Sequence, residues 1–135
     1  MTRRILVVDD EPSLRRTLER ALRNLAYEVA TVGEPDLAYD LLESGGFDLV
    51  LLDVNLGQIS GDTLFLALVR RAPELAHRVI LMSGDPWAVK EDWPPDLQRC
   101  PLLTKPFSLE ALAAIVAGAL AEADAAAPRR KRNGG

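Results

Sequence analysis

Apolar and polar residues follow a pattern that repeats five times along the chain. In each repeat, a short apolar run precedes a stretch in which apolar residues recur every three or four positions. Short apolar runs are typical of β-strands, and the longer period predicts amphipathic helices. The predicted strands cover residues 4–10, 27–32, 48–54, 78–84 and 100–107. This alternation predicts a doubly wound α/β domain, with a parallel sheet, helices on both faces and right-handed crossovers.

The run at 48–54 differs from the run at 27–32 in its pattern. Residues 49–52 are Leu or Val without interruption, which predicts a strand buried on both faces of the sheet. The run at 27–32 alternates and is only half apolar, so we expect it at an edge of the sheet. The buried strand ends in Asp53, and ligands of open α/β sheets bind at the carboxyl ends of strands. We therefore expect Asp53 to lie in a functional site.

Proline and glycine predict where the first three helices begin and end. Pro12 suits the first turn of a helix whose polar face carries Arg15 and other basic residues. A second helix is expected to end at the Ser-Gly-Gly sequence of 44–46. A third should follow a loop at 54–61 and stop at Pro73.

The segment between the last two strands leaves little room for a fourth helix. Residues 86–93 are long enough for two turns, but Pro94 and Pro95 should break them, so we expect a short helix. Trp87 and Trp93 are expected to pack against the edge of the domain.

A last helix is predicted to begin after Ser108. Its buried stripe is expected to consist of Leu109, Leu112, Ala113, Val116 and Leu120. From Ala123 onward the residues are mainly alanine, then basic residues, then two glycines, so we expect fraying there. This predicts one domain over 1–123 and a flexible basic tail over 124–135.

Length and composition limit the classes of protein to consider. The chain has 135 residues, of which 48% are hydrophobic and 27% charged, as is ordinary for one soluble domain. Cys100 is the one cysteine, so no internal disulfide is possible, and His77 is the one histidine, expected in an exposed loop. The first apolar run is too short for a signal peptide or a membrane span, so we expect a cytoplasmic protein.

The charge is distributed unevenly. The chain has a net charge of −4, and residues 128–135 carry four basic residues and no acid, which leaves −8 on residues 1–127. An acidic body argues against nucleic acid binding by the folded domain. The tail is either a solvated linker or an electrostatic tether to nucleic acid or another acidic partner.

Polar functional groups stand at four of the five predicted strand ends. These groups are Asp9 and Asp10, Asp53, Ser83, and Lys105. Because parallel strands place their carboxyl ends at one edge of the sheet, we treat the groups as a single site. The alternative role for Asp10 is simple capping of the following helix.

The charges of this predicted site favour a divalent cation. Asp9, Asp10 and Asp53 contribute −3 and Lys105 contributes +1, which leaves −2. Mg²⁺, or Mn²⁺, would balance this sum with oxygen ligands, whereas the lack of Cys and His ligands disfavours Zn²⁺. A carboxylate beside such a cation can attack a phosphoryl group, with Lys105 and Ser83 stabilising the transferring oxygens. The expected product is an aspartyl phosphate on Asp53.

Over residues 4–122, the chain resembles the receiver domain of bacterial two-component response regulators. Asp9 and Asp10 resemble the family's metal-binding acids, and Asp53 lies where the family has its phosphoacceptor. Asn55 matches the position whose backbone carbonyl completes the metal shell, and Gly61 matches a family glycine eight residues after the acceptor.

The later motifs strengthen this resemblance. Ser83 and Gly84 resemble the switch hydroxyl and its small follower. Lys105 and Pro106 resemble the invariant lysine and the proline whose preceding peptide bond is usually cis in the family.

The resemblance implies a fold, partners and a mode of action. The fold would be flavodoxin-like, with strand order 2-1-3-4-5 and five helices. A histidine kinase or a histidine phosphotransfer protein would supply the phosphoryl group. The domain would catalyse only its own phosphorylation and dephosphorylation, so it would not be an enzyme in the usual sense. Phosphorylation would draw Ser83 inward and alter the face formed by the fourth helix, fifth strand and fifth helix, where an effector protein or a linked output domain would respond.

The sequence departs from the family pattern in three places. Leu102 stands at a switch position that usually holds Tyr or Phe, Gly57 stands where a proline is common, and Pro94 and Pro95 shorten the fourth helix. The phosphorylation chemistry is therefore expected to be complete while the output route differs. We expect output to depend on repositioning of residues 83–87 instead of an aromatic rotation.

Three other interpretations fit the sequence less well. A haloacid dehalogenase-type phosphatase would carry an acid two residues after a nucleophile on its first strand, whereas here Asn55 follows Asp53 on the third. A flavodoxin-like cofactor carrier would need a phosphate-binding loop where this chain has the acids of 9–11. A degenerate receiver would bind partners without phosphorylation, but Asp53 and Lys105 are both present.

Overall fold

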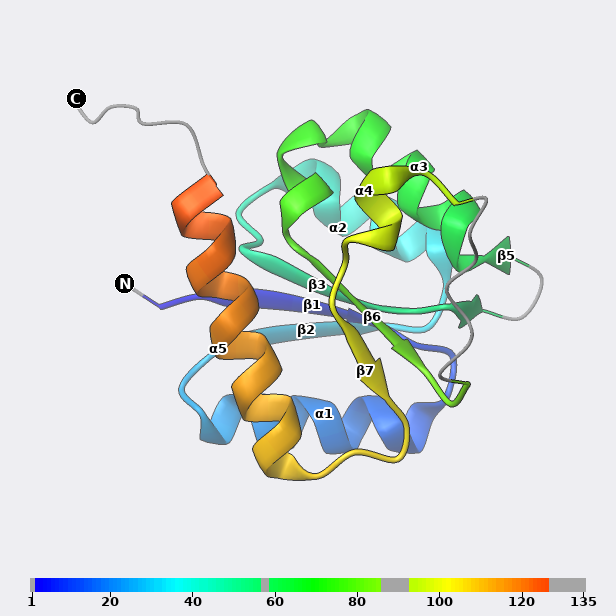
Figure 1. The fold of residues 1–135 in the computed structure, drawn as a ribbon. Coiled ribbons are helices and arrows are strands. Elements are labelled where there is room, and N and C mark those ends of the chain that lie inside the picture. Colours follow the sequence, from blue (N-terminus) through cyan, green and yellow to red (C-terminus); the bar gives the residue numbers. More distant parts are fainter. Residues whose placement is uncertain (1, 57–58, 86–92, 127–135) are drawn as a thin grey trace.

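The computed structural model describes residues 2–56, 59–85 and 93–126, and its centre is a five-stranded sheet (Figure 1). The strands, in chain order, are β1 (Arg4–Val8), β2 (Glu28–Val32), β3 (Leu49–Asp53), β6 (Val79–Ser83) and β7 (Leu102–Thr104). They lie in the order β2-β1-β3-β6-β7, and every pairing is parallel. The predicted α/β fold is confirmed, and β2 lies at an edge as expected.

The loop predicted for 54–61 instead contains a small antiparallel hairpin. Its strands are β4 (Asn55–Leu56) and β5 (Ile59–Ser60). These two short strands take numbers within the series, so the strand labels differ from the predicted order 2-1-3-4-5. The sequence pattern did not indicate the hairpin, because two-residue strands are too short to show an alternating period.

The helices form two layers, one on each face of the sheet (Figure 1). One layer contains α1 (Pro12–Asn24) and α5 (Leu109–Ala126), which pack on Ile5, Val7, Leu49 and Leu51. The other contains α2 (Pro35–Ser44), α3 (Gly61–Arg71), the 3₁₀ helix η1 (Pro73–His77) and α4 (Pro95–Gln98).

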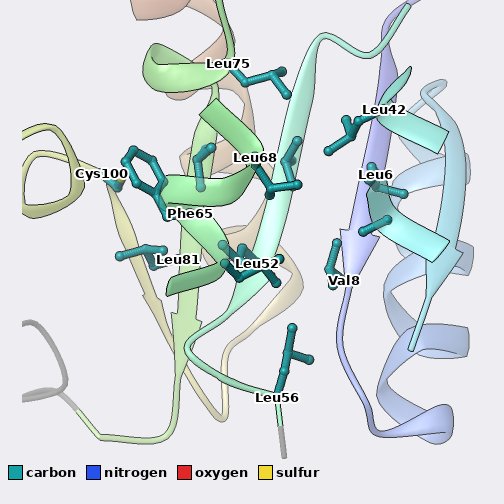
Figure 2. Packing of buried hydrophobic residues seen from close by; sticks show 14 of the residues in the cluster. Leu6, Val8, Leu42, Leu52, Leu56, Phe65, Leu68, Leu75, Leu81 and Cys100 are labelled. Carbon is teal, nitrogen blue, oxygen red and sulfur yellow. The ribbon is translucent and has the colours of Figure 1, made fainter. Parts of the chain in front are cut away.

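The second layer packs on the alternate residues of the same strands, as Figure 2 shows for Leu6, Val8 and Leu52. All five residues of β3 are buried, as its apolar run predicts. Gly45 and Gly46 follow α2 at φ 80° and 88°, a backbone region that favours glycine, so the predicted end of this helix is confirmed.

Prolines begin helices here more often than they end them. Pro73 follows the end of α3 but opens η1, which extends to the exposed His77. Pro94 and Pro95 were expected to break a helix at 86–93, and that break stays a prediction because residues 86–92 lie outside the described part. Pro95 itself opens α4, because its fixed φ suits a first helical turn. As predicted, α4 is short, with four residues. Trp93 is buried in the core, while Trp87 and the rest of the predicted two-turn segment lie outside the described residues.

The last helix differs from its prediction at both ends. Leu109 is 64% exposed instead of buried, because the first residue of α5 lies past the end of β7, where the sheet offers no surface (Figure 1). Ala113 is half-buried, and the other three residues of the predicted stripe are buried. The helix also continues to Ala126, beyond the fraying expected at Ala123.

A buried side chain and two ion pairs hold the C-terminal end of this helix in place. Ala123 is buried, and Asp124 pairs with Arg3 and Arg78. The division into a domain and a tail stays a prediction, since residues 127–135 lie outside the described part. Within the described part, no helix is long and apolar enough to cross a membrane.

Candidate functional site

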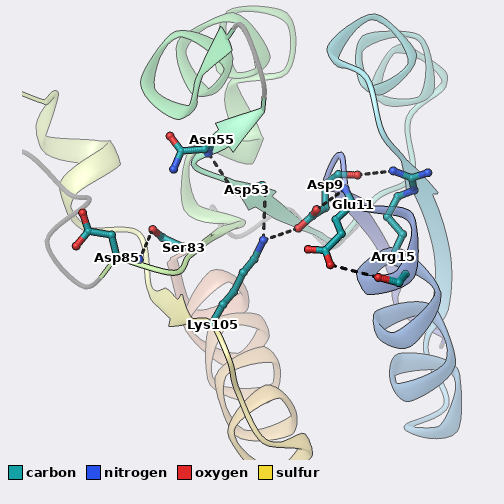
Figure 3. Close-up of polar contacts among 9 residues, drawn as sticks. Asp9, Glu11, Arg15, Asp53, Asn55, Ser83, Asp85 and Lys105 are labelled. Carbon is teal, nitrogen blue, oxygen red and sulfur yellow. Dashed lines mark hydrogen bonds and ion pairs between the residues drawn. The ribbon is translucent and has the colours of Figure 1, made fainter.

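The carboxyl ends of β1, β3, β6 and β7 bring the predicted site residues to one edge of the sheet (Figure 3). The strands stay in register to their ends, since Asp53 pairs with Met82 and Ser83 pairs with Thr104. The Lys105 N–H continues the ladder by donating to the Ser83 carbonyl at 2.7 Å. Residues far apart in sequence therefore meet because the parallel strands end together.

Lys105 connects two of the acids directly. Its ammonium lies 2.8 Å from Asp9 Oδ2 and 3.3 Å from Asp53 Oδ2. The peptide bond between Lys105 and Pro106 is cis, as the family resemblance implied. The structure thus brings together three of the predicted site residues through direct ion pairs.

Asp9 has no exposed surface, and each of its polar groups has a partner. Its N–H donates to the Val32 carbonyl at 3.1 Å, and Oδ1 accepts the Glu11 N–H at 2.9 Å. Oδ2 accepts from Lys105, and the backbone carbonyl accepts from Arg15 at 2.7 Å. Buried polar groups are costly without such partners, so these contacts explain how a carboxylate is tolerated here.

The carboxyl group of Asp53 is also buried, with 6% of the residue exposed. Oδ1 accepts the Asn55 N–H at 3.0 Å, and Oδ2 faces Lys105. Burial raises the pKa of Asp53, and the charge of Asp9 adds to this, although the Asn55 N–H and Lys105 act in the opposite direction. Two acids share one ammonium, so Asp53 remains short of positive charge.

The same imbalance acts on Lys105. Burial alone would lower the pKa of its ammonium, but the hydrogen bond to Asp9 and the charges of Asp53 and Asp9 raise the pKa overall. Lys105 is therefore held in its charged form.

Asp9, Asp10 and Asp53 form a group that could hold a metal ion. Each offers one carboxylate oxygen, and these oxygens lie within 4.8 Å of one another. Mg²⁺ holds its ligands at about 2.0–2.1 Å, so opposite ligands lie about 4 Å apart and only small movements are needed. Asp10 is exposed while the other two acids are buried, which leaves an open side for the waters that Mg²⁺ retains. The residues therefore fit the predicted cation, and the Asn55 carbonyl stays a predicted ligand.

Two of the three predicted switch residues, Ser83 and Gly84, lie at the carboxyl end of β6, next to the end of β3. Ser83 is buried, and its Oγ accepts the Asp85 N–H at 3.0 Å. A Cβ built on Gly84 would meet no atom within 4 Å, so described neighbours do not require glycine there. Leu102 is the first residue of β7 and pairs with Leu81. It is half-buried and packs against the core, away from the carboxyl end of β7.

The sequence prediction missed the contact that Arg15 makes at this site. We expected it on the polar face of α1, but its side chain turns back to the Asp9 carbonyl (Figure 3). An arginine one turn after a pair of acids is the signal that could have indicated this contact.

A family model described as "Response regulator receiver domain" matches residues 5–117. Among curated relatives, the chain is 34% identical over 122 residues to the nisin biosynthesis regulatory protein NisR of Lactococcus lactis, covering 86% of this chain and 49% of that protein. It is 40% identical over 84 residues to the two-component response regulator ORR26 of Oryza sativa, covering 61% of this chain and 14% of that protein. The chain thus spans half or less of the length of these relatives.

Solved structures with the same fold include NtrX from Brucella abortus, at a TM-score of 0.80 and 26% identity. That match covers 93% of this chain and 29% of NtrX. A CheY-like receiver domain protein from Methanospirillum hungatei has a TM-score of 0.80 at 20% identity, covering 94% of this chain and all of that one, which shows the fold alone. The match of the family model over most of the chain, together with the acids and lysine at the sheet edge, shows that this chain belongs to the response regulator receiver domains of two-component signalling.

Proposed function

We propose that Asp53 accepts a phosphoryl group, with Mg²⁺ or Mn²⁺ as cofactor, from a histidine kinase or a histidine phosphotransfer protein. The observation that carries the proposal is the contact of Lys105 with both Asp9 and Asp53, beside the three clustered acids. These residues supply a nucleophilic carboxylate, a positively charged ammonium and a set of oxygen ligands, all at the same edge of the sheet. We further propose that the domain works in the cytoplasm.

The proposed transfer requires one bond to form and one to break. A carboxylate oxygen of Asp53 attacks phosphorus, while the bond from phosphorus to the donor imidazole nitrogen breaks and its electron pair leaves with the imidazole. Lys105 and the Ser83 hydroxyl lie at neighbouring strand ends, where they can stabilise charge on the transferring oxygens. Asp9, Asp10, Asp53 and the Asn55 carbonyl would hold Mg²⁺, which when bound neutralises negative charge on those oxygens.

Asp53 is the proposed acceptor because of its position among the acids. It ends the central strand β3, between the ends of β1 and β6, whereas Asp10 is exposed at the rim. Slow hydrolysis of the aspartyl phosphate would restore the carboxylate. The domain would then act on no substrate other than its own phosphoryl group.

The proposed output begins at Ser83. Its Oγ accepts the Asp85 N–H, and a phosphoryl group on Asp53 would attract this hydroxyl. Since Leu102 cannot supply an aromatic rotation, the movement would pass through residues 83–87, of which 86 and 87 lie outside the described part. It would reach the face of α4, β7 and α5, where an effector protein or a linked output domain would bind. Comparing backbone amide NMR shifts with and without a phosphoryl mimic tests this route. Shifts that skip residues 83–90 would count against it.

Intact-mass measurement tests the phosphorylation itself. The chain is incubated with Mg²⁺ and a small-molecule phosphodonor, and the wild type should gain the mass of one phosphoryl group. Asp53→Ala should gain none, while Asp40→Ala, which removes an exposed acid of α2, should behave as the wild type. If the wild type gains nothing with saturating Mg²⁺, the alternative of a phosphorylation-independent binding module replaces this proposal.

A further inference from the structure

The side chain of Arg15 fills the space between two loops at the sheet edge. Its Nη1 donates to the Asp9 carbonyl in the β1–α1 loop at 2.7 Å. The same Nη1 also lies beside Gly33, the residue directly after β2. A Cβ built on Gly33 would lie 2.5 Å from Arg15 Nη1 and 3.1 Å from Cζ. The guanidinium therefore occupies the place that any larger residue at 33 would take.

The bond to the Asp9 carbonyl acts on Asp10 through the geometry of the peptide. The carbonyl of Asp9 and the N–H of Asp10 belong to one planar group, so holding the carbonyl also orients the start of Asp10. Among the described residues, the Asp10 side chain has no hydrogen-bond partner of its own, and it is exposed. Arg15 is therefore the charged group that restrains the peptide from which this predicted ligand projects.

The bond is also strong for a contact at the edge of a site. A guanidinium donor makes a charge-assisted hydrogen bond, which is shorter and stronger than one between neutral groups. Arg15 is half-buried, so water competes less for this bond than at an exposed position.

We propose that Arg15 is a positioning residue for the metal-binding acids, and that its guanidinium reaches the Asp9 carbonyl through the space that Gly33 leaves open. This inference rests on the proposed function, since it takes the ion to be Mg²⁺. Outer partners that orient metal ligands commonly change affinity about 10- to 100-fold when they are removed. A residue that only ties two loops together would change stability without changing affinity.

Four variants separate these roles. Arg15→Ala removes the hydrogen bond, and Arg16→Ala is its matched control, because Arg16 is an exposed arginine on the same helix. Gly33→Ala keeps the charge of Arg15 but displaces its guanidinium, and the backbone at Gly33 is not in the left-handed region, so alanine is compatible with it. Arg15→Lys keeps the charge and offers N–H donors without the planar guanidinium, so it should recover part of the affinity.

The first readout is the dissociation constant for Mg²⁺, measured by calorimetric titration at constant ionic strength. Arg15→Ala should bind about 10-fold more weakly, the lower end of the usual range. Gly33→Ala should also weaken binding, but it should add nothing in the Arg15→Ala background, because no guanidinium is left to displace. Arg16→Ala should change the constant by less than about twofold, since an exposed charge is screened.

The second readout needs no metal. In the metal-free protein, the amide NMR signals of Asp10 and Glu11 should shift in Arg15→Ala and in Gly33→Ala, but not in Arg16→Ala. Equal Mg²⁺ affinity in Arg15→Ala and Arg16→Ala would overturn the inference, as would unchanged Asp10 amides in Arg15→Ala. A wild type that binds no Mg²⁺ would refute the proposed function instead, and the metal-free amides would still decide the role of Arg15. Thermal unfolding confirms that each variant is folded.

Discussion

The two edges of the main sheet both carry clustered charges, but they differ in balance. At the carboxyl edge, Asp9 and Asp53 share the single ammonium of Lys105, and Asp10 adds a third negative charge. At the amino edge, two arginines and two acids balance each other. Arg3 lies 3.6 Å from Asp48 and also pairs with Asp124, and Arg78 lies 3.7 Å from Asp124.

The charged groups of the carboxyl edge are also more deeply buried than those of the amino edge. Asp9 has no exposed surface, whereas the side chain of Asp124 is 44% exposed. The pKa of Arg3 is raised mainly by its hydrogen bond to Asp124, so this network holds charges that are already paired. A buried excess of negative charge is typical of a site that binds a cation. A balanced network of half-exposed ion pairs is typical of a place where chain segments are held together. Here the balanced network attaches the end of α5 to the strand β1.

Removing the cation that pairs with Asp9 and Asp53 should have the largest effect. Lys105→Met leaves Asp9 and Asp53 buried without a counter-charge, so the free energy of unfolding at neutral pH should fall by about 3 kcal/mol. Urea unfolding measures this loss. A second change, Asp53→Asn, should recover much of it, and Arg20→Met, which removes an exposed cation, should cost little. Equal stability of Lys105→Met and the wild type would show that the two edges do not differ in this way.

Adding Mg²⁺ should stabilise the protein through the carboxyl edge alone. At 100 times its dissociation constant, a ligand that binds only the folded state adds about 2.7 kcal/mol to the free energy of unfolding. Asp10→Asn should lose most of this gain, and Asp124→Asn should keep it. Because the pKa of Asp53 is raised, protons compete with the metal at a higher pH than for an ordinary aspartate. The gain should therefore shrink as the pH is lowered, which calorimetry at two pH values can check.

The amino edge should show its own pH dependence at high pH, through Cys100. Burial raises the pKa of this thiol to about 12, from an ordinary value of 9.0. Between these values the unfolded thiol is ionised while the folded thiol keeps its proton, so stability is complete below pH 9 and falls as the pH rises. The expected slope is about 1.4 kcal/mol per pH unit above pH 9. Urea unfolding at pH 8 and pH 10 should show this loss of stability in the wild type and not in Cys100→Ala. Equal losses in the two proteins would refute the role of the thiol.

Breaking the balanced network should have the smallest effect. Asp124→Asn should lower the free energy of unfolding by about 0.5 kcal/mol at low salt, because exposed ion pairs contribute little and are screened. Glu122→Gln is the control, as it removes an exposed acid from the same helix. Thermal unfolding at low and high salt should show the difference between the variants vanish at high salt. A large loss that persists in salt would place this network with the buried charges of the other edge.

Much of the fold and of the site could be predicted from local sequence pattern. The uninterrupted run at 49–52 required a strand covered on both faces, because so many apolar side chains cannot face water. The acids at the carboxyl ends of β1 and β3 had to reach the same edge, since strands of a parallel sheet end together. Composition alone was enough to disfavour a zinc site and an internal disulfide.

Other features depend on where separate elements stop and what they meet. Leu109 keeps the spacing of a buried residue but is exposed, because the sheet ends before it. Asp124 belongs to a segment that was expected to fray, yet Arg3 and Arg78 lie within reach of it. Arg15 carries the pattern of a solvent-facing residue, yet it donates to the Asp9 carbonyl and lies beside Gly33, a residue from another part of the chain. Periodicity along a chain encodes which side of an element is apolar, whereas contacts between distant segments arise only once packing has placed them.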